Sequence, residues 1–387
     1  MPKSTSRLAA VAAGALLASL ALSGPAAHAA PGAHARPCKP ALRVLASLPG
    51  PGESPAPWSA STEVRDLGRA GLAVGRSQNR PAYWRGTSVH AVPLPAGYTS
   101  GAVEAVNRWG VMVGAMSGPG HPPAAFRYAP GMRAAKRLPG GDYAADINDR
   151  GHIAGYRALP DGKGVGLEWT GGTLRRELVL PAHTTHLRSV TAINNAGLIT
   201  GTSWGLADDA GYDAALLWTA DPAAPATELP EVYPGDSYST YEPREIDESG
   251  RITGTYGFTR IDVTNGTTWL PPYTTRTPAP DLGDRTKGTF EDISPTTGVS
   301  VGIASDSFII GPFPPDTAPP YQAQYWKGSG PVLALPRLAG TPGAHAGAYA
   351  VSDDDRVGGF AVDAADVMHP VVWTCASKQA YLPPAGS

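Results

Sequence analysis

The chain has 387 residues, of which 42 % are hydrophobic, enough to bury the core of one large domain or of two to three average ones. A formal net charge of −2 without any basic cluster gives no electrostatic basis for binding nucleic acid or an anionic membrane. Gly and Pro supply 47 and 40 residues, but they recur in a pattern, which distinguishes the chain from a disordered one.

Residues 1–29 have the features of a secretory signal peptide. Lys3 and Arg7 precede the apolar run Leu8–Leu22, and the sequence AHA at 27–29 follows as a small-x-small cleavage site. The apolar run is shorter than the ~20 residues that a membrane-spanning helix needs. We therefore expect cleavage directly after this site and a secreted, extracellular protein without membrane attachment.

The mature chain is predicted to have a flexible N-terminus at residues 30–40 and a single repeat domain at residues 41–387. Its two cysteines, Cys38 and Cys375, stand near the two ends. In an oxidising compartment such a pair indicates a disulfide rather than a thiol nucleophile or half of a zinc site. The bridge would bring the two ends of the chain together.

A ten-residue motif recurs along the chain, and its clearest copies are DINDRGHIAG at 146–155, AINNAGLITG at 192–201 and EIDESGRITG at 245–254. Four further copies align with it: DLGRAGLAVG at 66–75, AVNRWGVMVG at 105–114, DISPTTGVSVG at 292–302 and VSDDDRVGG at 351–359. The closing glycines are 39 to 57 residues apart, a spacing typical of blade-like or solenoid repeats.

Each motif is predicted to form a tight β-hairpin. Asn148 suits the first position of a type I turn, and Gly151 suits the fourth, where a left-handed conformation favours glycine. Alternating apolar residues on both sides extend as strands. We expect the last glycine of the motif, such as Gly155, to allow another strand to approach closely.

An aromatic residue at the end of a short apolar run follows each hairpin, and a strand that usually closes in Leu-Pro comes next. The aromatic positions are Trp84, Tyr128, Trp169, Trp218, Trp269, Trp326 and Trp373. One large aromatic per repeat at an equivalent position predicts packing between neighbouring units. Each unit then has four strands.

Seven four-stranded units with joined ends predict an all-β fold, a seven-bladed β-propeller. The segment Ala41–Pro49 resembles the Leu-Pro strand of the repeats, so we expect it to pair onto the last blade and close the ring beside the disulfide. A β-solenoid is the alternative. It would have shorter, more uniform units and distant ends.

The pattern [AD]-I-N-[ND]-x-G-x-I-x-G, followed by an aromatic and by Leu-Pro, resembles the extracellular HAF repeat family of secreted bacterial proteins over about residues 60–385. Where the naming His-Ala-Phe tripeptide would stand, this chain has other residues, such as Pro81-Ala82-Tyr83. The resemblance implies an extracellular repeat protein and brings no catalytic residue with it.

Several patterns that could carry chemistry fit structural roles better. Gly201–Gly205 matches G-x-S-x-G, which as a nucleophile elbow needs a strand-to-helix turn, but its first glycine closes a repeat. Ser352–Asp355 carries carboxylates without a calcium-loop spacing. Residues 262–269 match the box of sialidase-type propellers only in part, and His183 and His186 lack a third zinc ligand. We predict no catalytic residue, metal or cofactor.

The longest connections, at 203–212, 231–243 and 306–321, would emerge together on one face of a propeller, between second and third or fourth and first strands. They carry the predicted ligand-binding residues Trp204, Tyr212, Tyr233, Tyr238, Tyr241, Phe313 and Tyr321. Exposed aromatics on loops held by a rigid scaffold are typical of a binding face. The alternative is that these rings pack down over the loops.

Function is therefore predicted to be non-catalytic binding of an extracellular ligand by a monomer. Carbohydrate or cell-wall polymer is preferred over a protein ligand, because Tyr and Trp offer flat apolar faces with polar edges. A polysaccharide hydrolase or lyase is an alternative that would need convergent acids. A protein-interaction platform is the third hypothesis.

Overall fold

Antiparallel strands make up almost all regular structure in the computed structural model, which describes residues 38–50, 62–206, 213–231, 239–258, 263–283, 285, 287–305, 321–338 and 344–384. The predicted signal peptide lies outside these residues. Lys39–Ser387 form one unit, which we describe by itself. No helix within the described ranges is long and apolar enough to cross a membrane.

Three consecutive four-stranded meanders, each a separate antiparallel sheet, begin the fold. Their strands are β2 (Glu63–Leu67), β3 (Leu72–Ser77), β4 (Arg80–Arg85) and β5 (Ser88–Ala91); β6 (Ser100–Val106), β7 (Met112–Gly118), β8 (His121–Tyr128) and β9 (Lys136–Arg137); and β10 (Tyr143–Ile147), β11 (His152–Ala158), β12 (Gly164–Thr170) and β13 (Thr173–Glu177).

Three more meanders are joined into a twelve-stranded sheet by single parallel pairings of Asp213 with Thr240 and of Thr264 with Lys287. Their strands are β14 (Thr184–Ile193), β15 (Ile199–Leu206), β16 (Asp213–Trp218) and β17 (Thr227–Glu228); β18 (Ser239–Ile246), β19 (Ile252–Phe258), β20 (Val263–Trp269) and β21 (Arg276–Pro278); and β22 (Lys287–Ile293), β23 (Ser300–Ser305), β24 (Gln322–Trp326) and β25 (Leu333–Ala334).

The last sheet joins the two ends of the unit. Strand β1 (Ala41–Val44) pairs antiparallel with β28 (Met368–Thr374), beside β27 (Arg356–Val362) and β26 (Ala346–Ser352), and the short helix α1 (Ala376–Gln379) follows. The chain's two cysteines, Cys38 and Cys375, are disulfide-bonded. The predicted pairing of the N-terminal strand and the predicted bridge are both confirmed.

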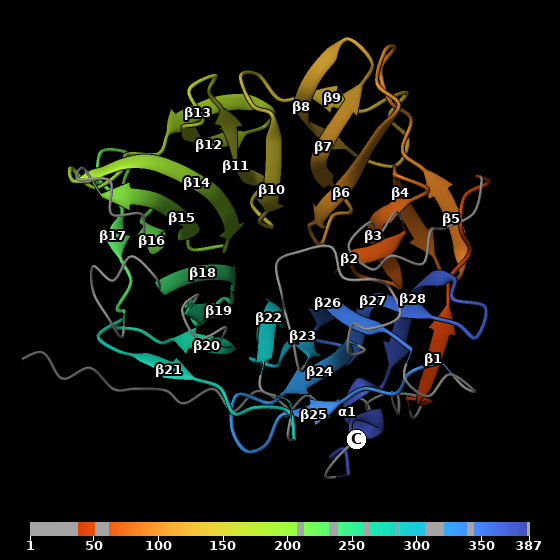
Figure 1. Ribbon diagram of the computed structural model, residues 1–387. Coiled ribbons are helices and arrows are strands. Elements are labelled where there is room, and N and C mark those ends of the chain that lie inside the picture. The colour runs from red at the N-terminus through yellow and green to blue at the C-terminus, as the bar shows by residue number, and fades with distance from the viewer. Residues whose placement is uncertain are drawn as a thin grey trace, which may run out of the picture. The chain divides into compact units, whose positions relative to one another are not determined.

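The first strands of the meanders contact one another in a closed circuit. The order is β2, β6, β10, β14, β18, β22, β26 and back to β2. These strands lie nearest the centre of the unit in Figure 1, and the later strands of each meander lie progressively outward. The meanders therefore surround one common centre.

Hydrophobic clusters fill the spaces between neighbouring meanders. One cluster joins Val113 and Leu138 of one meander to Ile153 and Trp169 of the next. Buried tryptophans also donate their indole N–H to a carbonyl near the end of the preceding meander: Trp84 to Ala46, Trp169 to Pro139, Trp218 to Val179, Trp269 to Pro230 and Trp373 to Pro336, at 2.7–2.9 Å. The recurrence of Trp and Leu-Pro in the sequence thus reflects contacts between units.

Candidate functional site

The first strand of every meander carries a β-bulge at the same place, shown by a shift of pairing register. The shifts lie between residues 64 and 66, 103 and 105, 144 and 146, 190 and 192, 243 and 245, 290 and 292, and 348 and 350. Strand residues normally alternate between faces, but a bulge re-aims a side chain. Adjacent residues, such as Arg244 and Glu245, consequently both line the central cavity.

The closing glycine of each motif lies opposite this bulge. Gly254 pairs with Pro243, and a Cβ at Gly254 would collide with the carbonyl oxygen of Glu242. A Cβ at Gly302 would collide in the same way with the carbonyl oxygen of Thr289. The expectation that these glycines allow close backbone approach is confirmed, because the bulged strand occupies the space of a side chain.

Three aspartates just after the bulges each bind two backbone amides. One carboxylate oxygen accepts the N–H of the following residue, and the other accepts an N–H from the first strand of the next meander. The pairs of amides belong to Leu67 and Val106 for Asp66, Ile147 and Ile193 for Asp146, and Ile293 and Val351 for Asp292, all at 2.5–2.7 Å. These bonds tie neighbouring meanders together at the centre.

The turn residue of the motif forms a second tie between meanders. Asn148 Oδ1 accepts the N–H groups of Arg150 and His152, which closes the predicted turn, and Gly151 has φ +78° there. The side-chain Nδ2 of Asn148 donates to the backbone carbonyl of Asn194 at 2.9 Å. Asn107 and Asn194 make the corresponding bonds to Asn148 and Asp247.

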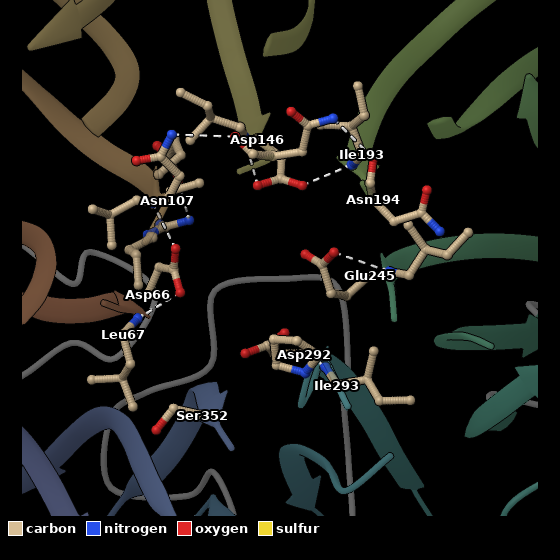
Figure 2. Close-up of a pocket in the computed structure, with 18 of the residues that line it drawn as sticks. Asp66, Leu67, Asn107, Asp146, Ile193, Asn194, Glu245, Asp292, Ile293 and Ser352 are labelled. Atoms are coloured by element: carbon tan, nitrogen blue, oxygen red, sulfur yellow. Dashed lines mark hydrogen bonds and ion pairs between the residues drawn. The ribbon is translucent and has the colours of Figure 1, made fainter. Parts of the chain in front are cut away.

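A cavity of about 1010 Å³ lies at the centre of the unit, within the circuit of first strands. Its wall runs from strand residues such as Arg65, Tyr143 and Tyr349 to the hairpin turns. The cavity is therefore at the hairpin-turn end of the unit. Figure 2 shows Asp66, Asp146, Glu245 and Asp292 directing their carboxyl groups into it from β2, β10, β18 and β22.

Ion pairs form deeper in the same wall. Arg65 contacts Glu104 at 3.2 Å and Glu63 at 2.6 Å. Arg244 contacts Glu242 at 2.6 Å and lies 3.8 Å from Glu291. Each arginine is therefore paired with carboxylates on the same or a neighbouring first strand. The side chain of Arg65 is 31 % exposed and that of Arg244 is 38 % exposed.

The four carboxyl groups around the cavity have raised pKa values. Removal from bulk water, which disfavours the charged form, is the main cause, and accepted amide hydrogen bonds oppose it. The pKa of Asp66 rises to about 6 and that of Asp146 to about 7. The pKa values of Glu245 and Asp292 rise well above the usual range, because burial is reinforced by neighbouring carboxylates.

Replacing Glu245 with Gln is expected to stabilise the fold at high pH only. A carboxyl whose pKa is higher in the folded than in the unfolded chain keeps its proton longer when folded. Its contribution is therefore most favourable below the unfolded pKa of about 4 and is lost as pH rises through the folded value. We expect Glu245→Gln to raise the free energy of unfolding at about pH 8 and to leave it unchanged at about pH 4.

Urea unfolding at the two pH values measures this difference. Gln keeps an oxygen that can accept the Ile246 N–H, the hydrogen bond that Glu245 makes now. An equal gain at both pH values would contradict the account, because it would have to come from packing and not from charge.

The structure describes three of the seven predicted ligand-binding residues: Trp204, Tyr241 and Tyr321. Tyr212, Tyr233, Tyr238 and Phe313 lie outside the described residues. Trp204 lies in β15, opposite His186 in the ladder. Tyr321 is half-buried, with its ring 5.1 Å from that of His345.

For Tyr241, the prediction of an exposed loop position is wrong. Strand β18 begins at Ser239, so Tyr241 is a strand residue, and its side chain is fully buried against Tyr256 and Trp269. Pro243 stands directly before the bulge, where a missing N–H is tolerated, so the strand continues through this residue. Tyr241 is therefore a core residue.

The remaining patterns have structural roles within the described residues. Ser203 is buried within β15, with no strand-to-helix turn. Asp353 accepts hydrogen bonds from Ser294 and Thr296, and Asp354 pairs with Arg356. No three His, Cys, Asp or Glu side chains in the part of the chain that is described converge as a metal site.

Sequence reasoning missed the central acids and one exposed tryptophan. The signal for the acids was present, since the first six copies of the motif open with Asp, Ala, Asp, Ala, Glu and Asp at positions 66, 105, 146, 192, 245 and 292, and Ala350 directly precedes the seventh. Trp109 occupies a hairpin turn and is 67 % exposed. The sequence signal for Trp109 was its bulky apolar side chain at a turn position where the other copies have small or polar residues.

No protein-family model matches the chain, and no curated protein matches it. Among solved structures, the β-propeller domain of the Trilobed protease from Pyrococcus furiosus is 9 % identical, with a TM-score of 0.52 over 81 % of this chain and 92 % of that one. A prolyl endopeptidase structure is 11 % identical, with a TM-score of 0.50 over 81 % of this chain and 49 % of that one, so this chain spans about half its length.

A putative TolB from Agrobacterium tumefaciens is 14 % identical, with a TM-score of 0.40 over 68 % of this chain and 86 % of that one. At such identities the likeness concerns the fold alone. The two higher-scoring matches, together with the meanders around a common centre, show that the chain has a β-propeller fold.

Proposed function

We propose that this chain is a secreted, non-catalytic β-propeller that binds an extracellular ligand, preferably a carbohydrate or a cell-wall polymer, in its central cavity. A volume of about 1010 Å³ can hold a ligand of several sugar units, since small-molecule sites commonly enclose roughly 300–1,000 Å³.

The exposed indole of Trp109 is the observation that carries this proposal. Its Nε1 donates to the carbonyl of Asp149 at 2.9 Å, and the Arg108 guanidinium lies 4.6 Å from the ring centre. Trp109 is not itself a lining residue, but the two residues that hold its ring, Arg108 and Asp149, both line the cavity, so the ring lies beside it. A fixed, exposed aromatic face beside polar groups suits stacking against a sugar ring.

We also propose the number of blades, the repeat family and the export of the chain. The circuit of first strands and the four-stranded meanders support a ring of seven blades, closed by β1. The motif supports membership of the HAF repeat family, and residues 1–29 support export and cleavage. A monomer is proposed.

Hydrolysis or elimination on a polysaccharide is the second candidate function. The observation in its favour is a set of neighbouring carboxyl groups whose pKa values differ, with that of Asp66 raised to about 6 and that of Glu245 raised well above its usual range. Binding is preferred, because Asp66, Asp146 and Asp292 use both carboxylate oxygens to hold backbone amides.

Trp109→Ala is expected to weaken oligosaccharide binding at least about tenfold, the equivalent of about 1.4 kcal/mol of stacking. Calorimetric titration of the purified chain with a panel of plant, fungal and bacterial oligosaccharides measures the affinity, and chromatography of the same mixtures detects any product. Tyr381→Ala is the control, because Tyr381 is also an exposed aromatic, at 42 %, and lies outside the cavity wall.

Other results would favour a different binding surface or a different function. Loss of affinity in Tyr233→Ala and Tyr238→Ala, with Trp109→Ala unaffected, would place binding on the long connections. Product release would favour the enzyme, and no binding by any oligosaccharide would leave a protein partner as the remaining hypothesis.

A further inference from the structure

The charges on the cavity wall are unbalanced. The lining residues include ten carboxylates and five guanidinium groups. Four of these guanidinium groups already have carboxylate partners: Arg65 with Glu104, Arg108 with Asp149, Arg244 with Glu291 and Arg356 with Asp354. The four central carboxylates, Asp66, Asp146, Glu245 and Asp292, form no ion pair with any residue in the described ranges. A positively charged group placed at the centre of the cavity would therefore favour the ionised form of these carboxyl groups, whose pKa values are raised by burial and by one another.

Glu245 differs from the three aspartates in its hydrogen bonds. Its Oε1 accepts the N–H of Ile246 at 3.0 Å. Its Oε2 accepts no hydrogen bond from any described residue, whereas both oxygens of each aspartate do. Figure 2 shows this carboxyl group extended toward the middle of the cavity. One carboxylate oxygen in the cavity is therefore free to accept a hydrogen bond from a ligand.

Glu245 does not bind a backbone amide of the next meander, as each of the three aspartates does. Each aspartate binds the amide that follows an alanine in the next copy of the motif, after Ala105, Ala192 or Ala350. The copy after Glu245 has Asp292 at that position, and Asp292 itself binds the corresponding amide, that of Ile293. Acid and alanine alternate around the circuit except at this one junction.

We propose that Glu245 binds a protonated amine of the ligand, so that the cavity selects sugars that carry a free amino group. This inference rests on the proposed carbohydrate-binding function and specifies its substrate class. An ammonium group donates up to three hydrogen bonds, and a charge-assisted bond to a carboxylate is stronger than a neutral one. The longer side chain of glutamate, compared with aspartate, carries its carboxyl group further into the cavity.

Three β-1,4-linked oligomers of equal length test the inference: glucosamine, N-acetylglucosamine and glucose. At about pH 7 the purified chain is expected to bind the glucosamine oligomer at least about tenfold more tightly than the other two. Glu245→Gln is expected to abolish this preference, by weakening binding of the glucosamine oligomer at least about tenfold. The variant remains assayable, because it removes an ionisable carboxyl group without removing the acceptor for Ile246.

Glu248→Gln is the matched control. Glu248 also lines the cavity but is exposed, and both its oxygens contact Asn195. This variant removes the same charge from the rim and is expected to keep most of the preference. If both variants lost the preference for the glucosamine oligomer equally, the preference would come from the total charge of the cavity and not from a bond to Glu245, and the inference would be overturned. Equal affinity for all three oligomers would overturn it while leaving the proposed function in place, and no binding by any oligomer would reject both.

Discussion

Gly302→Ala is expected to destabilise the protein by about 4 kcal/mol or more, and to prevent folding if the chain is only marginally stable. The residue closes its copy of the motif and pairs with Phe290, directly before the bulge in β22. A Cβ there would collide with the carbonyl oxygen of Thr289, which is backbone and cannot rotate away. Relief would require the bulge to open, and the bulge positions Glu291 and Asp292 in the cavity wall.

Gly288→Ala in the same sheet provides the control. A Cβ at Gly288 meets only the end of the Gln324 side chain, at 3.2 Å, and its backbone is not in the left-handed region. We expect its free energy of unfolding to change by no more than about 1 kcal/mol. Urea unfolding followed by circular dichroism compares the two variants, and similar losses in both would contradict the role assigned to the closing glycine.

Trp169→Ala is expected to cost about 4 kcal/mol, within the usual range for removing a buried aromatic side chain. The indole is completely buried and packs between two meanders, against Leu138 and Ile153. Its Nε1 also donates to the carbonyl of Pro139 at 2.9 Å. Trp169→Phe is expected to recover part of the loss, because the ring still fills much of the space while this carbonyl loses its donor.

Trp109→Ala is the matched exposed control for stability. That indole is 67 % exposed, so its removal is expected to change the free energy of unfolding by less than about 0.5 kcal/mol. If Trp169→Ala were as mild as Trp109→Ala, packing between meanders would not depend on the repeated aromatic, and the account of the core would be wrong.

Features repeated in every unit could be predicted from the sequence, because the same residue types recur at equivalent positions where the local backbone or the packing requires them. The hairpin turn with Asn148 and Gly151, the closing glycine and the buried aromatic were all predicted on that basis. The pairing of Ala41–Val44 onto the last sheet was predictable because this segment resembles the missing strand of that unit.

The cavity could not be derived in the same way, because its residues meet only in three dimensions. Asp66 and Glu245 are far apart in the sequence, and their convergence depends on the bulge before each of them. Period-two reasoning cannot locate a bulge, since the extra residue reverses the face of every side chain that follows it. The same bulge tolerates Pro243, so a strand that contains Tyr241 runs through part of the segment that was predicted as a long connection.

Hydrogen–deuterium exchange with and without the glucosamine oligomer tests the central claim most directly, because it locates the ligand on the chain. We expect protection at hairpin turns around the cavity, at residues 107–110, 148–151 and 194–197, whose Asn residues line it. Protection confined to the long connections at 203–212, 231–243 and 306–321, or absent from the whole chain, would contradict binding in the central cavity.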